Sequence, residues 1–250
     1  MPYAQRYVAF LDILGFSEIV KSTERNERQF EALAKAIEQI NSRENELDDI
    51  AQFDFRFQTF SDSIVMSVAD NAPALLYLLQ SIKAIAFNLL GNGLLVRGAI
   101  SKGALHHTST VMFGPAFIDA YRIEQLVAKY PRVVIGQVVY AEMLRVRGGL
   151  LNPRYRLGDD GPPHLDILQD IGELNSKPVT PELMQSDVII NAQSCQRILQ
   201  NLIDQSIHEP KHFEKLRWFG IYWNGTVGFT PGALIASVTF PGSRNATWRA

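Results

Sequence analysis

The segment Tyr7–Phe16 (YVAFLDILGF) places one acidic residue inside an otherwise apolar run. Residues 6–13 are rich in Val, Phe, Leu and Ile, which is typical of a strand buried on both faces. A carboxylate at the end of such a strand loses its hydration unless another group compensates for the loss. The fold therefore has to bring a compensating group to Asp12.

Alternating helix and strand patterns follow along the chain. A short helix is predicted after Gly15, and longer helices over residues 27–46, 72–90, 116–129 and 138–145. Further strands are predicted over residues 53–58, 64–68, 94–102 and 133–135, with residues 104–109 pairing back after Gly103. This order predicts an α+β fold, a ferredoxin-like β-α-β-β-α-β sheet with helices on one face.

The predicted core spans residues 1–147, and residues 148–250 form an extension packed on it, within the same domain. Residues 148–180 contain several Pro, Gly and Asp residues and are interpreted as a loop or a short hairpin. A helix is predicted over residues 181–207. The end of the chain, residues 216–250, holds all three tryptophans and is expected to be partly a closing strand.

Composition excludes several classes of protein. A formal net charge of -2 gives no basic field for non-specific nucleic-acid binding. The N-terminus has no signal-peptide pattern, and the apolar stretch 72–96 is interrupted by polar residues and a Gly-Asn-Gly turn, so neither secretion nor a membrane span is expected. One cysteine excludes an internal disulfide and fits a reducing compartment. These observations favour a cytoplasmic protein.

The predicted topology brings Asp12 close to a second carboxylate. Strand one lies antiparallel to strand three, so its C-terminal end meets the turn that carries Asp62. Two adjacent carboxylates repel each other unless cations lie between them, which favours a divalent metal site. Gly15 and the helix that begins at Phe16 add backbone N–H groups that suit a phosphate. Alternatively, Asp12 caps the following helix and Asp62 stabilises a turn, and topology alone leaves both interpretations open.

Four motifs in order resemble those of the class III nucleotidyl cyclases. They are FLDILGFS (Phe10–Ser17), FSDSIVMS (Phe60–Ser67), VRGAISKGALHH (Val96–His107) and MFGPAFIDAYRIEQL (Met112–Leu126). The resemblance covers about residues 6–136. Within the class, these segments are most similar to the bacterial pyrimidine nucleotide cyclases of the anti-phage Pycsar systems, which make cyclic UMP or cyclic CMP to activate a separate effector protein.

The resemblance implies roles for several residues. Asp12 and Asp62 would ligate two divalent ions, Mn²⁺ or Mg²⁺, with the backbone carbonyl of Ile13 completing one of them. The phosphate oxygens would be bound by the residues directly after the strand, Gly15, Phe16 and Ser17. In class III cyclases the site forms between two subunits, so a homodimer with two equivalent sites is implied.

The base-reading positions depart from those of purine cyclases. Gln58 stands where adenylyl cyclases have a lysine, and Val111 falls at the second base-reading position, which argues against cyclic AMP as the product. An amide both donates and accepts hydrogen bonds, so Gln58 could pair with uracil or cytosine. Phe57 or Arg56 could narrow the pocket for a smaller base.

Two arginines are candidates for contacts with the triphosphate. Arg122 stands where the resembled family has its transition-state arginine, since a planar guanidinium suits charge developing on a phosphate; the alternative is a surface arginine. Arg97 is either a phosphate or base contact or a member of a structural ion pair. Ile118 replaces the asparagine that aligns the ribose in the family. Asp119 and Glu124 are expected on a solvated helix face.

The expected function is therefore conversion of UTP to 3′,5′-cyclic UMP and pyrophosphate, as a second messenger in anti-phage defence. The choice of uracil follows its prevalence in the resembled family. Alternatives are a cytidylate cyclase acting on CTP and a catalytically inactive nucleotide-binding sensor. A dinucleotide cyclase of the diguanylate type is disfavoured because the turn reads Phe-Ser-Asp-Ser, without the Gly-Gly-Asp/Glu-Glu-Phe hairpin.

Overall fold

The computed structural model describes residues 3–45, 53–146, 155–158, 161–174, 187–227 and 235. The chain divides into two compact units: residues 1–86 with 95–166, and residues 87–94 with 167–250. The first unit contains the β-sheet, and the described part of the second unit is helical.

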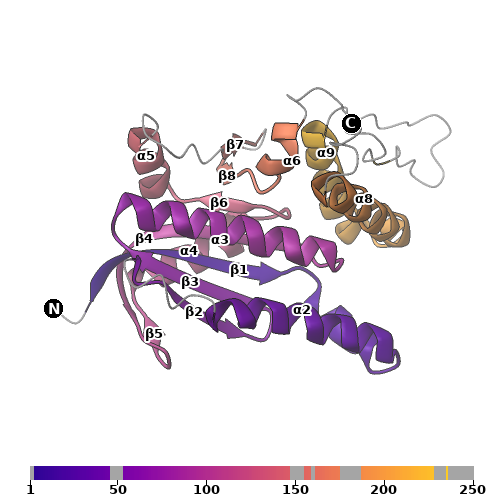
Figure 1. Ribbon diagram of the computed structural model, residues 1–250, viewed down its shortest axis with the longest axis horizontal. Helices are drawn as coiled ribbons and strands as arrows, with labels where there is room; N and C mark the ends of the chain where they lie inside the picture. The colour runs from indigo at the N-terminus through magenta and orange to yellow at the C-terminus, as the bar shows by residue number, and fades with distance from the viewer. Residues whose placement is uncertain are drawn as a thin grey trace. The chain divides into compact units, whose positions relative to one another are not determined.

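The first unit begins with a strand-helix-strand-strand-helix-strand arrangement (Figure 1). Its elements are β1 (Ala4–Ile13), α1 (Phe16–Thr23), α2 (Glu27–Asn45), β2 (Arg56–Phe60), β3 (Ser63–Ala69), α3 (Ala72–Gly91) and β4 (Val96–His107). The strands lie in the order β2-β3-β1-β4, and each is antiparallel to its neighbours. This is the ferredoxin-like order, so the predicted α+β fold class is confirmed.

The sheet continues beyond this core. The later elements are β5 (Met112–Phe113), α4 (Pro115–Val127), β6 (Val133–Ile135), α5 (Gln137–Val146), β7 (Tyr155–Leu157) and β8 (Pro163–Leu165). β6 pairs with β4 in parallel, and the β7–β8 hairpin adds to β6 through Val134 and His164. The hairpin expected after residue 148 is therefore present. The domain boundary at residue 147 stays a prediction, although the sheet itself extends past that residue.

β4 is longer than predicted. We expected a break at Gly103, but the strand runs through it to His107, and β5 is the segment that pairs back, with Met112 opposite His107. A Cβ added at Gly103 would lie 3.5 Å from the Cβ of Ala116. This glycine therefore lies inside the strand, in ordinary contact distance of α4, rather than in a turn.

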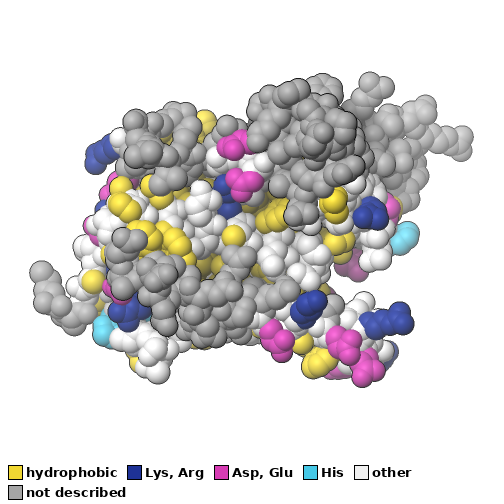
Figure 2. Space-filling view, in the orientation of Figure 1, with side chains coloured by type: hydrophobic (Ala, Val, Ile, Leu, Met, Phe, Trp, Pro, Cys, Tyr) yellow, Lys and Arg dark blue, Asp and Glu magenta, His cyan; other side chains and the backbone are white. Residues whose placement is uncertain are grey.

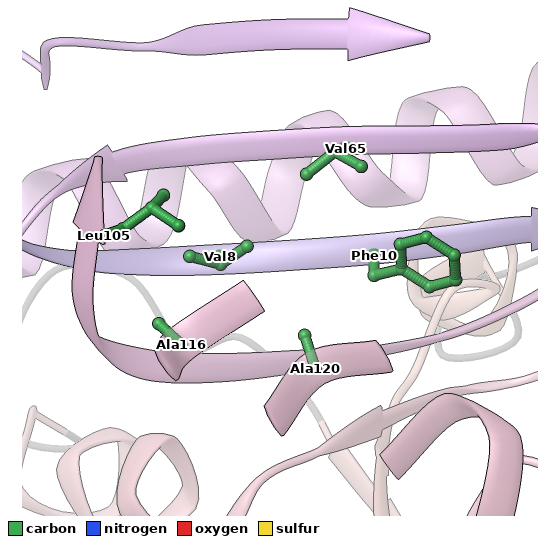
Figure 3. Packing of buried hydrophobic residues seen from close by; sticks show 6 residues of the cluster. All are labelled: Val8, Phe10, Val65, Leu105, Ala116 and Ala120. Carbon is green, nitrogen blue, oxygen red and sulfur yellow. The ribbon is translucent and has the colours of Figure 1, made fainter. Parts of the chain in front are cut away.

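Helices cover both faces of the sheet, not one as expected. Figure 3 shows Val8 and Phe10 of β1, Val65 of β3 and Leu105 of β4 on one face, with Ala116 and Ala120 of α4 packed against them. Figure 1 shows α3 on the other side of the sheet. Because side chains alternate along a strand, the even-numbered residues of β1 point towards α4.

Of the described helices, α3 is long and apolar enough to cross a membrane by length and composition alone. The core helix of a soluble domain meets the same test, and 56% of this apolar window is buried inside the protein. On the face drawn in Figure 2, acidic and basic side chains are interspersed around α2, without a continuous field of one sign.

The second unit is built around a pair of long helices. Its described elements are α6 (Gln169–Leu174), α8 (Asp187–Gln205), the short 3₁₀ helix η2 (Ser206–His208) and α9 (Pro210–Val227). The side chain of Asn224 pairs with the backbone N–H and C=O of Ile235. Residues 216–227 are helical, so the closing strand expected within part of 216–250 does not lie there. Most of the chain after 227, like residues 181–186 of the predicted helix, lies outside the described residues, so that strand stays a prediction.

Candidate functional site

The C-terminal end of β1 is held from both sides. The backbone N–H of Ile13 donates to the carbonyl of Asp62, at 2.9 Å, and the N–H of Leu14 donates to the carbonyl of Leu95, at 2.8 Å. The first bond joins the end of β1 to the β2–β3 turn, and the second joins it to the start of β4. The juxtaposition of Asp12 with Asp62 that the topology predicted is therefore present.

Asp62 lies in a tight two-residue turn. β2 and β3 pair up to Phe60 opposite Ser63, which leaves Ser61 and Asp62 to connect them. Ser61 has φ 56°, a left-handed conformation that is uncommon for a residue other than glycine. Backbone strain of this kind persists where the surrounding structure fixes the conformation, as the hydrogen bond to Ile13 does here.

Helix α1 begins directly after this point. Gly15 caps it in the left-handed conformation, with φ 71°, and its carbonyl accepts from the N–H groups of Glu18 and Ile19. The first N–H groups of a helix have no intrahelical acceptor, so those of Phe16 and Ser17 are of the kind that suits an anion. Three residues lie between Asp12 and Phe16, the first residue of α1.

A chain of three charged side chains crosses the site from β1 to α4. Arg97 lies directly opposite Asp12 on β4, and its Nε is 3.0 Å from Asp12 Oδ2. The same Nε is 2.7 Å from Glu124 Oε1, while Glu124 Oε2 accepts from the amide of Gln125. Arg97 thus pairs with two carboxylates, as the ion-pair interpretation expected.

Glu124 corrects the sequence prediction of a solvated helix face, because its side chain is fully buried, with 0% exposure. Burial raises the pKa of Glu124, the Arg97 guanidinium lowers it, and the negative charges of Asp12 and Asp62 raise it. Both aspartates therefore lie near Glu124. The signal that could have revealed it is a carboxylate two positions after Arg122, on the opposite side of the helix from that exposed residue.

The two predicted base contacts on β2 lie on different faces of the sheet. Gln58 pairs in register with Val65, which packs under α4, so its side chain shares the face of Asp12. Its Oε1 is buried and has no hydrogen-bond partner among the described residues. Phe57 is buried on the other face, stacked with Phe55, and is therefore not placed to contact a ligand bound beside Asp12.

Arg122 lies away from Asp12 within one chain. It is exposed on α4, and the helical repeat puts it on the opposite side from Glu124. Its neighbours Ile118 and Tyr121 are 47% and 45% exposed. Arg122 and Phe57 are therefore two predicted site residues that do not lie beside Asp12 of the same chain.

The donor set fits a divalent ion that arrives with a phosphate ligand. No group of three or more His, Cys, Asp or Glu side chains able to hold a metal occurs in the described part of the chain. Two carboxylates, Asp12 and Asp62, with backbone carbonyls beside them, match the way Mg²⁺ is held by one or two carboxylates plus substrate phosphates. The side chain of Asp12 is 18% exposed, so it remains accessible.

No protein-family model matches the chain, and no curated protein matches it. Solved structures are similar at low identity. A class III adenylyl cyclase-like ATP-binding protein from Pseudomonas aeruginosa matches with 13% identity and a TM-score of 0.40, over 60% of this chain and 38% of that one.

Two further solved structures match this chain over nearly the whole of their own length. The catalytic core of a rhodopsin-guanylyl cyclase with converted specificity, in complex with ATPαS, has 14% identity and a TM-score of 0.44 over 65% of this chain and 93% of its own. An adenylate/guanylate cyclase/hydrolase from Silicibacter pomeroyi has 16% identity and a TM-score of 0.39, and the match covers 65% of this chain and 94% of that one. The ferredoxin-like strand order is a property of this chain's own sheet and holds independently of these similarities.

Proposed function

We propose that the protein is a pyrimidine nucleotide cyclase that converts UTP to 3′,5′-cyclic UMP and pyrophosphate, with Mn²⁺ or Mg²⁺. The observation that carries the proposal is the bond between Ile13 N–H and the Asp62 carbonyl, which brings two carboxylates together directly before the N-terminus of α1. The end of the sheet where β1 meets the β2–β3 turn would thereby offer metal ligands beside a helix N-terminus that binds phosphate.

Each residue has a distinct task in this proposal. Asp12 and Asp62, with the Ile13 carbonyl, would hold two divalent ions, which when bound acidify the ribose 3′-hydroxyl and neutralise the triphosphate. The N–H groups of Phe16 and Ser17, after Gly15, would bind phosphate oxygens. Arg97 is 21% exposed beside Asp12, within reach of a triphosphate held there.

The base would lie along the α4 face of β2. A buried oxygen without a donor, such as Gln58 Oε1, is costly to leave unpaired, and the N3–H of uracil is a donor of the right kind. The same amide can turn its NH₂ towards the N3 of cytosine, so CTP with cyclic CMP as the product is the closest alternative. The base would be read here without the lysine of adenylyl cyclases.

A second copy of the chain completes the proposed site. Arg122 faces away from its own Asp12 and is flanked by the exposed apolar side chains Ile118 and Tyr121. In a symmetric homodimer, this surface of α4 would bring Arg122 to the partner's triphosphate, where a guanidinium stabilises developing charge. The proposed biological role is anti-phage defence, in which the cyclic nucleotide acts on a separate effector protein.

The direct test incubates the purified protein with each of the four ribonucleoside triphosphates and Mn²⁺, and identifies the products by mass spectrometry. Cyclic UMP with pyrophosphate is expected from UTP. Asp62→Ala should lower the rate at least about a hundredfold, because a metal ligand is lost. Glu31→Ala, at an exposed position on α2, is the control and should retain activity. A cyclic product that survives Asp62→Ala would refute the two-carboxylate mechanism.

A second candidate is a nucleotide-binding sensor without turnover. Two observations favour it: Ile118 stands at the ribose-aligning position, and Asp12 is paired with Arg97 rather than with a group that a metal ion displaces easily. Calorimetric binding of UTP without any cyclic product would support the sensor and contradict the cyclase.

A further inference from the structure

Arg97 is shared between two carboxylates that differ in exposure. Its Nε lies 3.0 Å from Asp12, whose side chain is 18% exposed, and 2.7 Å from Glu124, whose side chain is fully buried. The guanidinium therefore connects an accessible carboxylate to an inaccessible one. The Nε–H donates its hydrogen bond to Asp12, whereas the shorter contact with Glu124 is an ion pair without a hydrogen bond.

Glu124 fixes where Arg97 can go. A fully buried carboxylate that lost its cation would be an uncompensated buried charge, which is strongly destabilising. Arg97 is therefore retained by Glu124 whatever happens at Asp12. Of the two carboxylates, Asp12 is the one that a cation from solvent can reach, because its side chain is 18% exposed.

A cation beside Asp12 opposes the binding of another cation to the same carboxylate. We propose that Arg97 competes with the divalent ion for Asp12, and that Glu124 is a positioning residue that holds Arg97 when the ion takes its place. This inference rests on the proposed metal site at Asp12 and Asp62. In this proposal, the ion pair between Arg97 on β4 and Glu124 on α4 controls the affinity for the divalent ion before any nucleotide is bound.

The proposal predicts changes of opposite sign in two variants. Glu124→Gln removes the buried competitor for the guanidinium, so Arg97 pairs more strongly with Asp12 and Mn²⁺ should bind about fivefold or more weakly. The double variant Arg97→Gln with Glu124→Gln removes the competing cation and leaves no unpaired buried charge, so Mn²⁺ should bind about fivefold or more tightly than to the wild type.

The measurement is Mn²⁺ binding to the nucleotide-free protein, followed by electron paramagnetic resonance of the free ion. The matched control is Glu142→Gln, which removes a carboxylate 2.6 Å from Lys102 elsewhere in the first unit and should leave Mn²⁺ affinity unchanged. If Glu124→Gln does not fold, the proposal is tested by the double variant alone, which must bind Mn²⁺ more tightly than the wild type. Shifts in the same direction in both variants, or no shift in the double variant, would overturn the inference.

Asp12→Asn separates this inference from the proposed function. Loss of Mn²⁺ binding in that variant supports the metal site, and the Arg97 and Glu124 variants then test the competition alone. Unchanged Mn²⁺ binding in Asp12→Asn would mean that the proposed metal site is wrong, and the inference would fall with it.

Discussion

His107 is a buried histidine whose environment favours its neutral form. It is 6% exposed at the end of β4, and its Nδ1 lies 2.8 Å from the hydroxyl of Ser67, which also accepts from Nε of Arg6. A hydroxyl has one donor and two acceptor sites, so the direction of its bond with Nδ1 of His107 depends on the tautomer of the imidazole. Burial first, and then the positive charges of Arg6 and Arg56, lower the pKa of His107 to about 4.

This depressed pKa predicts a loss of stability in acid. As pH falls below the ordinary value of 6.5, the unfolded chain binds a proton at His107, whereas the folded chain does so only near pH 4. The contribution of neutral His107 to the free energy of unfolding is therefore complete above pH 6.5. It falls by about 3 kcal/mol as the pH is lowered from 6.5 to 4. Urea unfolding across this range should show a shallower pH slope in His107→Gln than in the wild type.

In His107→Gln, the free energy of unfolding should still depend on pH, because burial likewise lowers the pKa of His164 to about 4. His106→Gln is the matched control, since His106 points to the opposite side of β4 and packs on Phe113. An identical slope in His107→Gln and the wild type would contradict the buried neutral form of His107.

At the scale of the element, β4 contains two glycines with different demands. A Cβ at Gly98 would lie 2.4 Å from the carbonyl oxygen of Phe10 and 2.6 Å from a methyl group of Leu11, whereas one at Gly103 would meet Ala116 at an ordinary 3.5 Å. Gly98→Ala should therefore push β4 from β1 and lower the free energy of unfolding by about 1–3 kcal/mol. Gly103→Ala should change it by less than about 1 kcal/mol.

Chemical denaturation of both variants measures the difference. Because Gly98 is next to Arg97, Gly98→Ala should also weaken the contact between Arg97 and Asp12. Equal stability of the two variants would show that the spacing between β1 and β4 is not set by this glycine.

The pattern of apolar residues predicted those helices and strands whose burial repeats regularly along the segment. β1 was recognisable because its apolar run matches burial on both faces, and α3 because its leucines recur at helical spacing up to a glycine. The strand order followed from the sequence of elements, and it was enough to bring Asp12 to Asp62. These features need only information within a segment or the rules of strand connection.

Long-range contacts explain what could not be predicted. Glu124 resembled a solvated residue because its partner, Arg97, lies on another element 27 positions earlier. Gly103 resembled a turn because the helix packed against it is invisible in the local pattern. The face occupied by Phe57 depended on the register of β2, which a shift of one residue would reverse.

At the scale of the whole molecule, the proposed site requires two copies of the chain. One chain supplies Asp12, Asp62, Gly15 and Arg97 to one end of the sheet, while its Arg122 is exposed on the side of α4 away from Glu124. A symmetric dimer that exchanges Arg122 would contain two sites, each with metal ligands from one chain and the arginine from the other.

Mixing inactive variants tests this exchange. Asp62→Ala and Arg122→Ala should each lose about a hundredfold or more in rate, because one lacks a metal ligand and the other a charge-stabilising donor. When the two are mixed and allowed to exchange subunits, half of the dimers should be mixed, and each mixed dimer regains one of its two sites. Cyclic nucleotide production should then recover to about a quarter of the wild-type rate.

The control mixture is Asp12→Ala with Asp62→Ala. Both aspartates belong to the same chain's half of the site, so every site in that mixture lacks one of them and no recovery is expected. Recovery in the first mixture but not in the second requires Arg122 to act across the dimer. If both mixtures stay inactive while sedimentation shows mixed dimers, Arg122 is a surface residue and the charge at the phosphate must be stabilised from within one chain, which would leave Arg97 as the candidate.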